Sequence, residues 1–307
     1  MREVEPCLIA FYEGLQIEEG DEDCLERGRF RYRDWHKEKD EFLKLMIIND
    51  CFALEIMLAN KRYATGEQRE YDFRDLVFGA ERMIYLFPDL KQDMLLLQNQ
   101  LPLLALTTLA AIDVNTLIKA FYNLSSSSPE GQIISEGLND PAKQSFYILD
   151  LYRKILTSEG EYLPSYKQNL ESATELRNAG VSFYKSNTKS FRDISFNGSI
   201  LSLPPLKVDD ATESSLLNIM AFERLHATAG NEVTAYAFFM AGLIRTADEV
   251  ALLRTDEIIM GWVGANGNIA NIFNKITKEK TLVLFKEDIQ VDVNGKLNTY
   301  CKKRMHR

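Results

Sequence analysis

The sequence is poor in the residues from which metal and redox sites are usually built. Its 307 residues include three histidines and four cysteines, and the cysteines form no C-x-x-C pair. They are Cys7, Cys24, Cys51 and Cys301. Because no apolar leader begins the chain, these cysteines are typical of reduced thiols in a cytosolic protein. For the same reason we expect no glycosylation at the two Asn-x-Ser sequons, Asn123 and Asn197.

Long apolar runs and an excess of basic charge are missing as well. No uninterrupted apolar run approaches the roughly 20 residues that cross a bilayer, which predicts a soluble chain. The net charge is −9 and the pI is near 5.1. This balance argues against nucleic acid as a partner, because proteins that bind nucleic acid normally present a basic surface.

The motifs of the common hydrolases and nucleotide-dependent enzymes are also absent. The sequence contains no G-x-S-x-G, no P-loop and no H-E-x-x-H. The absence of these motifs argues against an enzyme. It does not exclude one, because catalytic groups can be scattered along a chain.

Apolar spacing predicts a mainly α protein, a compact multi-helix domain with one small β-hairpin around residues 191–204. Dense apolar segments such as 42–58 have helical periodicity. The hairpin is predicted at Asn197-Gly198, the preferred pair for a type I′ turn, between two short alternating runs.

The same reading divides the chain into two parts. Residues 1–40 are a charged, variable N-terminal segment, and residues 41–307 are the helical domain. Within that domain, serines, proline and glycine predict a flexible loop near residues 124–141.

The leucine-rich stretch DMLLLQNQLPLLAL contains three consecutive polar amides, Gln98, Asn99 and Gln100. Because Pro102 forbids a continuous helix, we expect one helix to end near these amides and another to begin at the proline. The amides would then satisfy unpaired backbone groups at the two ends. Replacing Asn99 by leucine is therefore expected to destabilise the fold.

The spacing Glu223-x-x-His226 places two possible metal ligands on one helical face, as in di-iron bundles. Such a site needs a second copy, and neither remaining histidine has a glutamate three residues earlier. The residues at those positions are Arg33, before His36, and Lys303, before His306. We therefore interpret His226 as a histidine near a helix end.

Two further patterns match known motifs only in part. GWVGANG, residues 261–267, has the spacing G-x-x-G-x-x-G instead of the dinucleotide-binding G-x-G-x-x-G, and we interpret it as a loop. The S-x-x-K matches 182–185 and 186–189 lack the partner motifs of penicillin-binding enzymes, and we assign them to a helix end.

The pair Asp209-Asp210 can be interpreted in two ways. Asp210 as N-cap and Glu213 three residues later match a capping box, which explains the pair as a helix start. The alternatives are cation binding through Asp209, or an acid and base in a cleft that residues 93–102 also line.

Several blocks of the sequence resemble the motifs of one known family. DMLLLQNQLP resembles D-L-L-L-L-E-N-Q-[IL]-P, and FLKLMIINDCFALEIML resembles F-x-x-M-M-L-x-D-x-C-F-[IL]-L-E-L. FRDISFNGSILSLPPLKVDDATE resembles L-x-D-I-x-F-x-x-G-x-L-x-I-P-x-L-x-[IV]-D-D-x-T-E. GLIRTADEVALLRTDEIIMGWVG resembles S-L-I-[NR]-T-x-x-D-V-x-L-L-x-x-x-G-I-I-x-N-x-L-G, and all blocks follow in order over roughly residues 40–300. With these blocks the chain resembles the plant family called domain of unknown function 247, also named uncharacterised protein family 0481.

The resemblance implies a plant protein without an established enzymatic activity. Members commonly end in a hydrophobic helix that anchors them to a membrane, and some grass members are implicated as pollen-side determinants of self-incompatibility. This chain departs from the family in three ways: Gln98 replaces a glutamate, the I-G-P-[YF]-H-[HR]-G motif is missing, and the chain stops at CKKRMHR without the anchor.

We therefore expect a non-enzymatic recognition or signalling protein that acts through other proteins, related to self-incompatibility determinants. Residues 1–40 and the loop near 124–141 are the expected contact surfaces. The alternatives are an enzyme with a cleft near 93–102 and 209–213, and an oligomerising helical scaffold; oligomeric state stays open.

We expect no catalytic, cofactor-binding or metal-binding residues. The expected location is the cytoplasm for the chain as it stands, or the cytosolic face of a membrane, the plasma membrane above all, where the family anchor is present. Such an anchor would follow a basic end suited to a juxtamembrane position, formed by Lys302, Lys303, Arg304 and Arg307.

Overall fold

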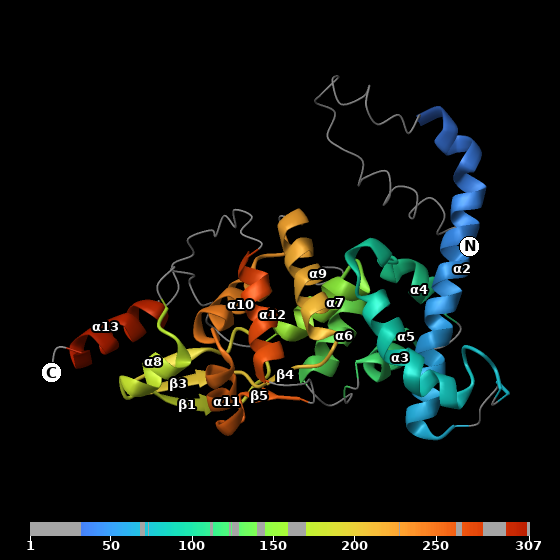
Figure 1. The fold of residues 1–307 in the computed structure, drawn as a ribbon. Coiled ribbons are helices and arrows are strands. Elements are labelled where there is room, and N and C mark those ends of the chain that lie inside the picture. Colours follow the sequence, from blue (N-terminus) through green and yellow to red (C-terminus); the bar gives the residue numbers. More distant parts are fainter. Residues whose placement is uncertain are drawn as a thin grey trace. The chain divides into compact units, whose positions relative to one another are not determined.

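The computed structural model describes residues 32–67, 71–72, 74–110, 113–122, 124, 129–139, 145–158, 170–226, 228–261, 266–278 and 293–305. These residues are mainly helical with two small sheets, which confirms the predicted fold class (Figure 1). They group into two compact units, although the sequence suggested one helical domain. Unit 1 comprises Met1–Met94 and Gln100–Ile148, and unit 2 comprises Leu95–Asn99 and Leu149–Arg307.

Unit 1 is built around one long helix against which three others pack. Its helices are α2 (Tyr32–Thr65), α3 (Ala80–Met94), α4 (Leu103–Leu109), α5 (Val114–Phe121) and α6 (Pro129–Asn139). Helix α2 contacts α3, α4 and α5, and its buried side chains Ile56 and Met57 form part of the core. It begins within the charged N-terminal segment, so residues 32–40 of that segment are helical.

The flexible loop predicted near 124–141 is wrong for most of its length. Residues Pro129–Asn139 form α6, and α6 buries Ile134 against unit 1. Pro129 occupies the first helical position, which tolerates proline because its missing N–H would have no partner there. Residues 125–128 and 140–144 lie outside the described part of the chain.

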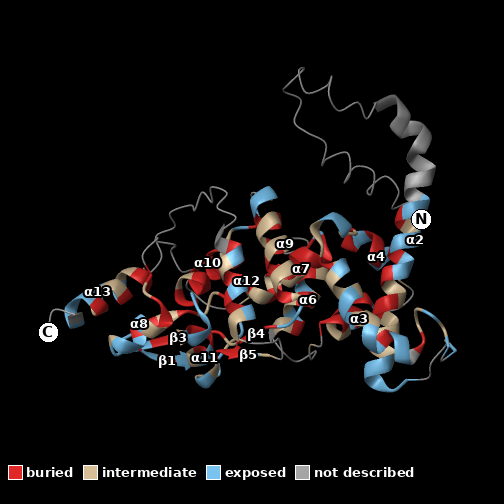
Figure 2. Ribbon diagram, in the orientation of Figure 1, coloured by how far each residue is buried: buried red, intermediate tan, exposed pale blue. Residues whose placement is uncertain are grey.

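Unit 2 contains helices together with two small sheets. Its helices are α7 (Ile148–Leu156), whose first residue belongs to unit 1, α8 (Ala173–Asn178), α9 (Thr212–Leu225), α10 (Glu232–Leu243), α11 (Ala247–Thr255), α12 (Asn266–Lys278) and α13 (Val293–Met305), with a 3₁₀ turn, η1 (Leu97–Asn99). Helix α10 is buried along almost its whole length and packs against α9 and α12 (Figure 2). Among the described residues, no helix has the length and apolar content needed to span a membrane.

The predicted hairpin exists, but its turn is of a different type. Strands β2 (Ser195–Asn197) and β3 (Ile200–Leu203) are antiparallel, and Asn197 pairs with Ile200. The central turn residues are therefore Gly198 and Ser199, and only Gly198, at φ +64°, has a positive φ. That pattern belongs to a type II′ turn, which needs glycine at its first central position, so the predicted type I′ turn is wrong.

Two parallel pairings complete the sheets of unit 2. Strand β1 (Ser182–Lys185) pairs in parallel with β3, which gives the strand order β1-β3-β2. Strand β4 (Leu206–Lys207) pairs in parallel with β5 (Ile259–Met260). These pairings join segments far apart in sequence, and the hairpin signal alone does not predict them.

The helix break at Pro102 is confirmed, with its first boundary moved. Helix α3 ends at Met94, four residues earlier than expected, and α4 begins at Leu103 with Pro102 as N-cap. Gln100 donates a side-chain hydrogen bond to the carbonyl of Met94 at 3.0 Å, as one of the amides was expected to do.

The other two amides do not fill a buried break, because Gln98 and Asn99 are exposed. The destabilisation expected for Asn99→Leu stays a prediction, now for an exposed side chain. Within unit 2, the side chain of Asn218 on α9 accepts a hydrogen bond from the N–H of Leu97 at 2.8 Å, and its amide donates to the Ser214 carbonyl at 2.7 Å.

Candidate functional site

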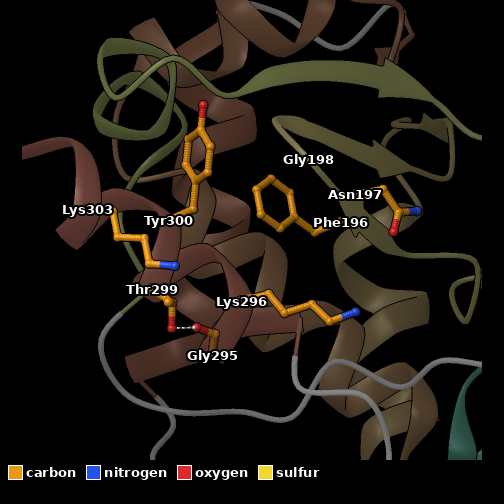
Figure 3. Close-up of a pocket in the computed structure, with 8 residues that line it drawn as sticks. All are labelled: Phe196, Asn197, Gly198, Gly295, Lys296, Thr299, Tyr300 and Lys303. Atoms are coloured by element: carbon orange, nitrogen blue, oxygen red, sulfur yellow. Dashed lines mark hydrogen bonds between the residues drawn. The ribbon is translucent and has the colours of Figure 1, made fainter.

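A groove of about 720 Å³ lies in unit 2 between the β2–β3 hairpin and helix α13. The hairpin contributes residues 196–198, and α13 contributes one polar and aromatic face (Figure 3). The residues that line the groove are Phe196, Asn197, Gly198, Gly295, Lys296, Thr299, Tyr300 and Lys303.

The spacing of the α13 residues explains why they share one face. Lys296, Thr299, Tyr300 and Lys303 stand at positions i, i+3, i+4 and i+7, which follow one side of an α-helix. The Tyr300 ring meets the Phe196 ring edge to face, with centroids 5.6 Å apart. The Tyr300 hydroxyl also donates to the carbonyl of Gly180 at 3.3 Å, so two contacts attach α13 to the sheet region.

The groove is basic although the whole chain is acidic. Residues 293–305 carry four cations and no carboxylate, and hairpin residues 195–203 carry no charge at all. Lys296 and Lys303 are both exposed and, within the part of the chain that the structure describes, neither forms an ion pair. These two amines are therefore available to an anionic ligand.

The chemistry of the lining is suited to binding. The eight lining residues include no Asp, Glu, His, Cys or Ser side chain. The Thr299 hydroxyl donates to the Gly295 carbonyl of its own helix at 2.7 Å, so no general base activates it as a nucleophile (Figure 3). Lysines, aromatic rings and an amide can hold a ligand through charge, apolar contact and hydrogen bonds.

The structure gives Glu223 a structural role. Its carboxylate is buried and accepts hydrogen bonds from the N–H groups of Val233 and Thr234, both at 2.9 Å, and from the Thr234 hydroxyl at 2.6 Å. It therefore caps the N-terminus of α10 from α9. Burial raises the pKa of Glu223 to about 7, against these hydrogen bonds and the charge of Arg153, which lower it.

The second member of the Glu-x-x-His pattern lies at the end of α9, as expected. His226 is its C-cap, and the imidazole ring lies 4.3 Å from the ring of Phe222. Within the described ranges, no three His, Cys, Asp or Glu side chains gather in a way that could hold a metal ion. His306 and the side chain of His36 lie outside the described residues.

The S-x-x-K matches do not lie at a helix end. Residues Ser182–Lys185 form strand β1, where positions three apart point to opposite faces, so Ser182 and Lys185 cannot act together. Lys185 pairs with Glu257 at 3.0 Å, and the Ser186 hydroxyl donates to the Thr188 carbonyl at 2.9 Å. Apolar alternation through Val181 and Phe183 is the signal for a strand that the sequence analysis missed.

The glycines of GWVGANG divide between a loop and a helix. Gly261, at φ +133°, follows β5 closely enough that a Cβ would meet the Val208 carbonyl oxygen at 2.0 Å. Asn266 and Gly267 are the first residues of α12, so the loop interpretation is wrong for them. Residues 262–265 lie outside the described part.

The capping box predicted for Asp210 and Glu213 is wrong. Helix α9 begins at Thr212 and its N-cap, Ala211, provides no side-chain cap. The Asp209 N–H donates to the Thr212 hydroxyl, and that hydroxyl donates to the Asp209 carboxylate, both at 2.9 Å. Glu213 forms an ion pair with Lys275 of α12. The two hydrogen bonds between Asp209 and Thr212 form in place of the predicted capping box, and the helix begins one position later than predicted.

The cleft proposed for the enzyme alternative gains no support from these contacts. Asp209 and Glu213 are each engaged by a neighbour, and in unit 2 the 3₁₀ turn η1 contacts α9 at Asn218, six residues beyond Thr212.

The groove residues were missed because the basic end of the chain was interpreted as juxtamembrane. The sequence signal that could have found them is the i, i+3, i+4, i+7 pattern of 296–303.

Comparison with known proteins agrees with the family blocks. The model of the plant family of unknown function DUF247 matches residues 16–307. This chain belongs to that family. The groove lies within the matched range.

Two plant proteins show the similarity at the level of the sequence. The UPF0481 protein At3g47200 of Arabidopsis thaliana is 26% identical over 317 residues, which cover 92% of this chain and 63% of that protein. The putative UPF0481 protein At3g02645 of the same plant is 26% identical over 156 residues, 50% of this chain and 28% of that protein. The chain thus spans less than two thirds of the length of these relatives, and no solved structure matches it.

Proposed function

We propose that this DUF247 protein is a recognition protein, not an enzyme, and that it binds another protein through the groove between α13 and the hairpin. The observation that carries the proposal is the lining. Among the residues that the structure describes, it offers Lys296 and Lys303 without ion pairs, the paired rings of Phe196 and Tyr300, and no paired acid, base or nucleophile.

Family membership also supports a role in protein recognition. Because the family resemblance implies partner recognition for some grass members, signalling or self-recognition is the biological setting we propose. A place at the cytosolic face of a membrane, through an anchor such as family members commonly have, belongs to the proposal as well. Residues 1–40 and 124–141 remain predicted contact surfaces, and residues 1–31 lie outside the described part.

The oligomerising scaffold is the weaker candidate. It requires an exposed apolar face, and α2 has one in Leu45, Ile48 and Phe52, which are 56%, 63% and 45% exposed. Nothing in the described residues identifies what would cover this face. The charge of the groove, by contrast, identifies the chemistry of its ligand.

The proposal is tested by capturing partners from plant tissue with three forms of the chain. These are the natural sequence, the double variant Lys296→Glu with Lys303→Glu, and the control Lys302→Glu. Lys302 is exposed on the same helix and does not line the groove, so the control makes one charge reversal, half the change in charge of the double variant, without touching the site. We expect a set of proteins that the natural chain and the control retain and the double variant loses. Equal retention by all three forms would contradict the proposal.

A further inference from the structure

We infer that the ligand of this groove is an extended acidic segment of the partner protein, with two carboxylates four positions apart and an apolar side chain between them. The inference rests on the proposed function and adds the chemistry of the partner. Three features of the groove carry it: the open edge of β2, the spacing of the two lysines, and the aromatic rings between the hairpin and the helix.

The edge of the sheet is the first feature. The N–H of Ser182 in β1 donates to the Ser199 carbonyl, and the N–H of Ser186, just after β1, donates to the Leu203 carbonyl, so the odd-numbered residues of β3 face β1. The even-numbered residues of β3 therefore face β2, where their partners are Ser195 and Asn197. Between those two, the backbone N–H and C=O of Phe196 point away from β3. Within the described residues β2 pairs with β3 alone, so these groups can pair with an added extended chain.

The spacing of the lysines is the second feature. Lys296 and Lys303 are seven residues apart on α13, which places their Cα atoms about 10 Å apart along the helix axis. In an extended peptide alternate side chains face one way and each residue advances about 3.3 Å. Positions i and i+4 therefore face the groove about 13 Å apart, a separation that two long, flexible lysine side chains can match. Positions i and i+3 face opposite ways.

The rings of Phe196 and Tyr300 are the third feature. They meet edge to face between the hairpin and α13, where Phe196 is buried and Tyr300 is half-buried, so an apolar side chain at position i+2 of the peptide would pack on the part of the Tyr300 ring that stays exposed (Figure 3). The groove, of about 720 Å³, lies within the size range of ligand sites in proteins. An acid–any–apolar–any–acid pattern follows from these three features together.

The two amines alone are also compatible with an anionic membrane surface. A membrane would attract every exposed cation of α13, including Lys302 and Arg304 outside the groove. The aromatic contact and the open strand edge would not contribute to binding a membrane surface. They favour the peptide, and the membrane is kept as an outcome of the test.

The experiment uses the full chain and three fluorescently labelled peptides, followed by fluorescence anisotropy. The probe is Gly-Glu-Ser-Leu-Ser-Glu-Gly, the register control is Gly-Glu-Ser-Leu-Glu-Ser-Gly, and the charge control replaces both glutamates of the probe by glutamine. We expect the probe to bind about fivefold more tightly than either control, the factor that a loss of about 1 kcal/mol gives. Lys296→Glu and Lys303→Glu should each weaken the probe about five- to tenfold, and Lys302→Glu should change it less than twofold.

The outcomes separate the inference from the proposed function. Equal binding of the probe and the register control would overturn the inference, as would equal loss in Lys303→Glu and Lys302→Glu. The groove would instead bind a membrane surface if two results came together. Sedimentation of the chain with phosphatidylserine vesicles would fall equally in all three lysine variants, and the three peptides would bind equally. If the double variant loses its captured proteins while no peptide binds preferentially, the inference fails and the proposed function stands. If the probe binds more tightly than the register control, but the double variant retains the same captured proteins as the natural chain, the proposed function fails instead.

Discussion

Glu257 adopts a backbone conformation that glycine normally adopts. Its φ is +57°, and among the described residues no other non-glycine residue has a positive φ. The family pattern L-L-x-x-x-G-I-I has glycine at this position. A side chain there costs about 1 kcal/mol, and the exposed ion pair with Lys185 at 3.0 Å returns only a fraction of it.

We therefore expect Glu257→Gly to raise the free energy of unfolding by about 0.5–1 kcal/mol. Glu257→Ala is the matched control, because it removes the ion pair and keeps the side chain that strains the backbone. Urea unfolding of the three proteins distinguishes the two causes. If the alanine variant gains as much stability as the glycine variant, backbone strain is not the reason.

Asp50 is a buried carboxyl group on the core face of α2. It is 1% exposed, it lies between the buried Met46 and Ala53, and its Oδ1 accepts no hydrogen bond from the residues that the structure describes. Burial raises the pKa of Asp50 from 3.8 to about 7. The folded state thus binds this proton more tightly than the unfolded state, and the contribution of Asp50 to stability falls as pH rises from about 4 to about 7.

Asp50→Leu should raise the free energy of unfolding at pH 8 by about 1–3 kcal/mol, the usual cost of a buried polar group without a partner. The gain should be smaller at pH 5, where Asp50 of the natural chain is protonated in the folded state. Unfolding curves at the two pH values measure this difference. A gain of the same size at both would show that the charge of Asp50 does not cause it.

At the scale of elements, helices α8 and α11 each begin with a capping box, and a hydrogen bond connects the two N-termini. Ser172 with Glu175 caps α8, and Thr246 with Glu249 caps α11. The Thr174 hydroxyl of α8 also donates to the Glu249 carboxylate, so one side chain serves both helices. Burial raises the pKa of Glu249, but the hydrogen bonds from Thr174 and Thr246 outweigh burial and lower it to about 2.

Glu249→Ala should therefore cost about 1–2 kcal/mol of stability, the range for a lost cap, and should loosen both helices. Because the folded pKa lies below the ordinary value of 4.5, the contribution of the carboxylate is complete above about pH 4.5 and disappears as pH falls towards 2. Amide hydrogen exchange at pH 7 measures protection in each helix. Faster exchange confined to α11 would contradict the link to α8.

At the scale of the whole molecule, the local signals of the sequence predicted the helices, the hairpin and the break at Pro102. They failed where a choice depended on partners far along the chain. The parallel pairing of β1 with β3 and the capping of α10 by Glu223 are examples, since each joins segments whose local sequence is compatible with other structures. The sequence carries both S-x-x-E and T-x-x-E boxes, yet it does not say which of several such patterns begins a helix.

The groove shows the same limit. Lys296, Thr299, Tyr300 and Lys303 share a helical face by spacing alone, so their common orientation could be predicted. That this face meets Phe196, about 100 residues earlier, depends on tertiary packing that no local pattern encodes. The fold class was therefore predictable, and the candidate site was not.

The central claim is that α13 and the hairpin form the surface that recognises a partner. The most direct measurement is the quantity of each captured protein retained by the Lys296→Glu/Lys303→Glu chain relative to the Lys302→Glu chain, with both shown to unfold at the same temperature. Loss of at least one partner from the double variant, with full retention by the control, is the predicted result. Identical retention by two equally stable chains would contradict the claim and move the recognition surface elsewhere on the molecule.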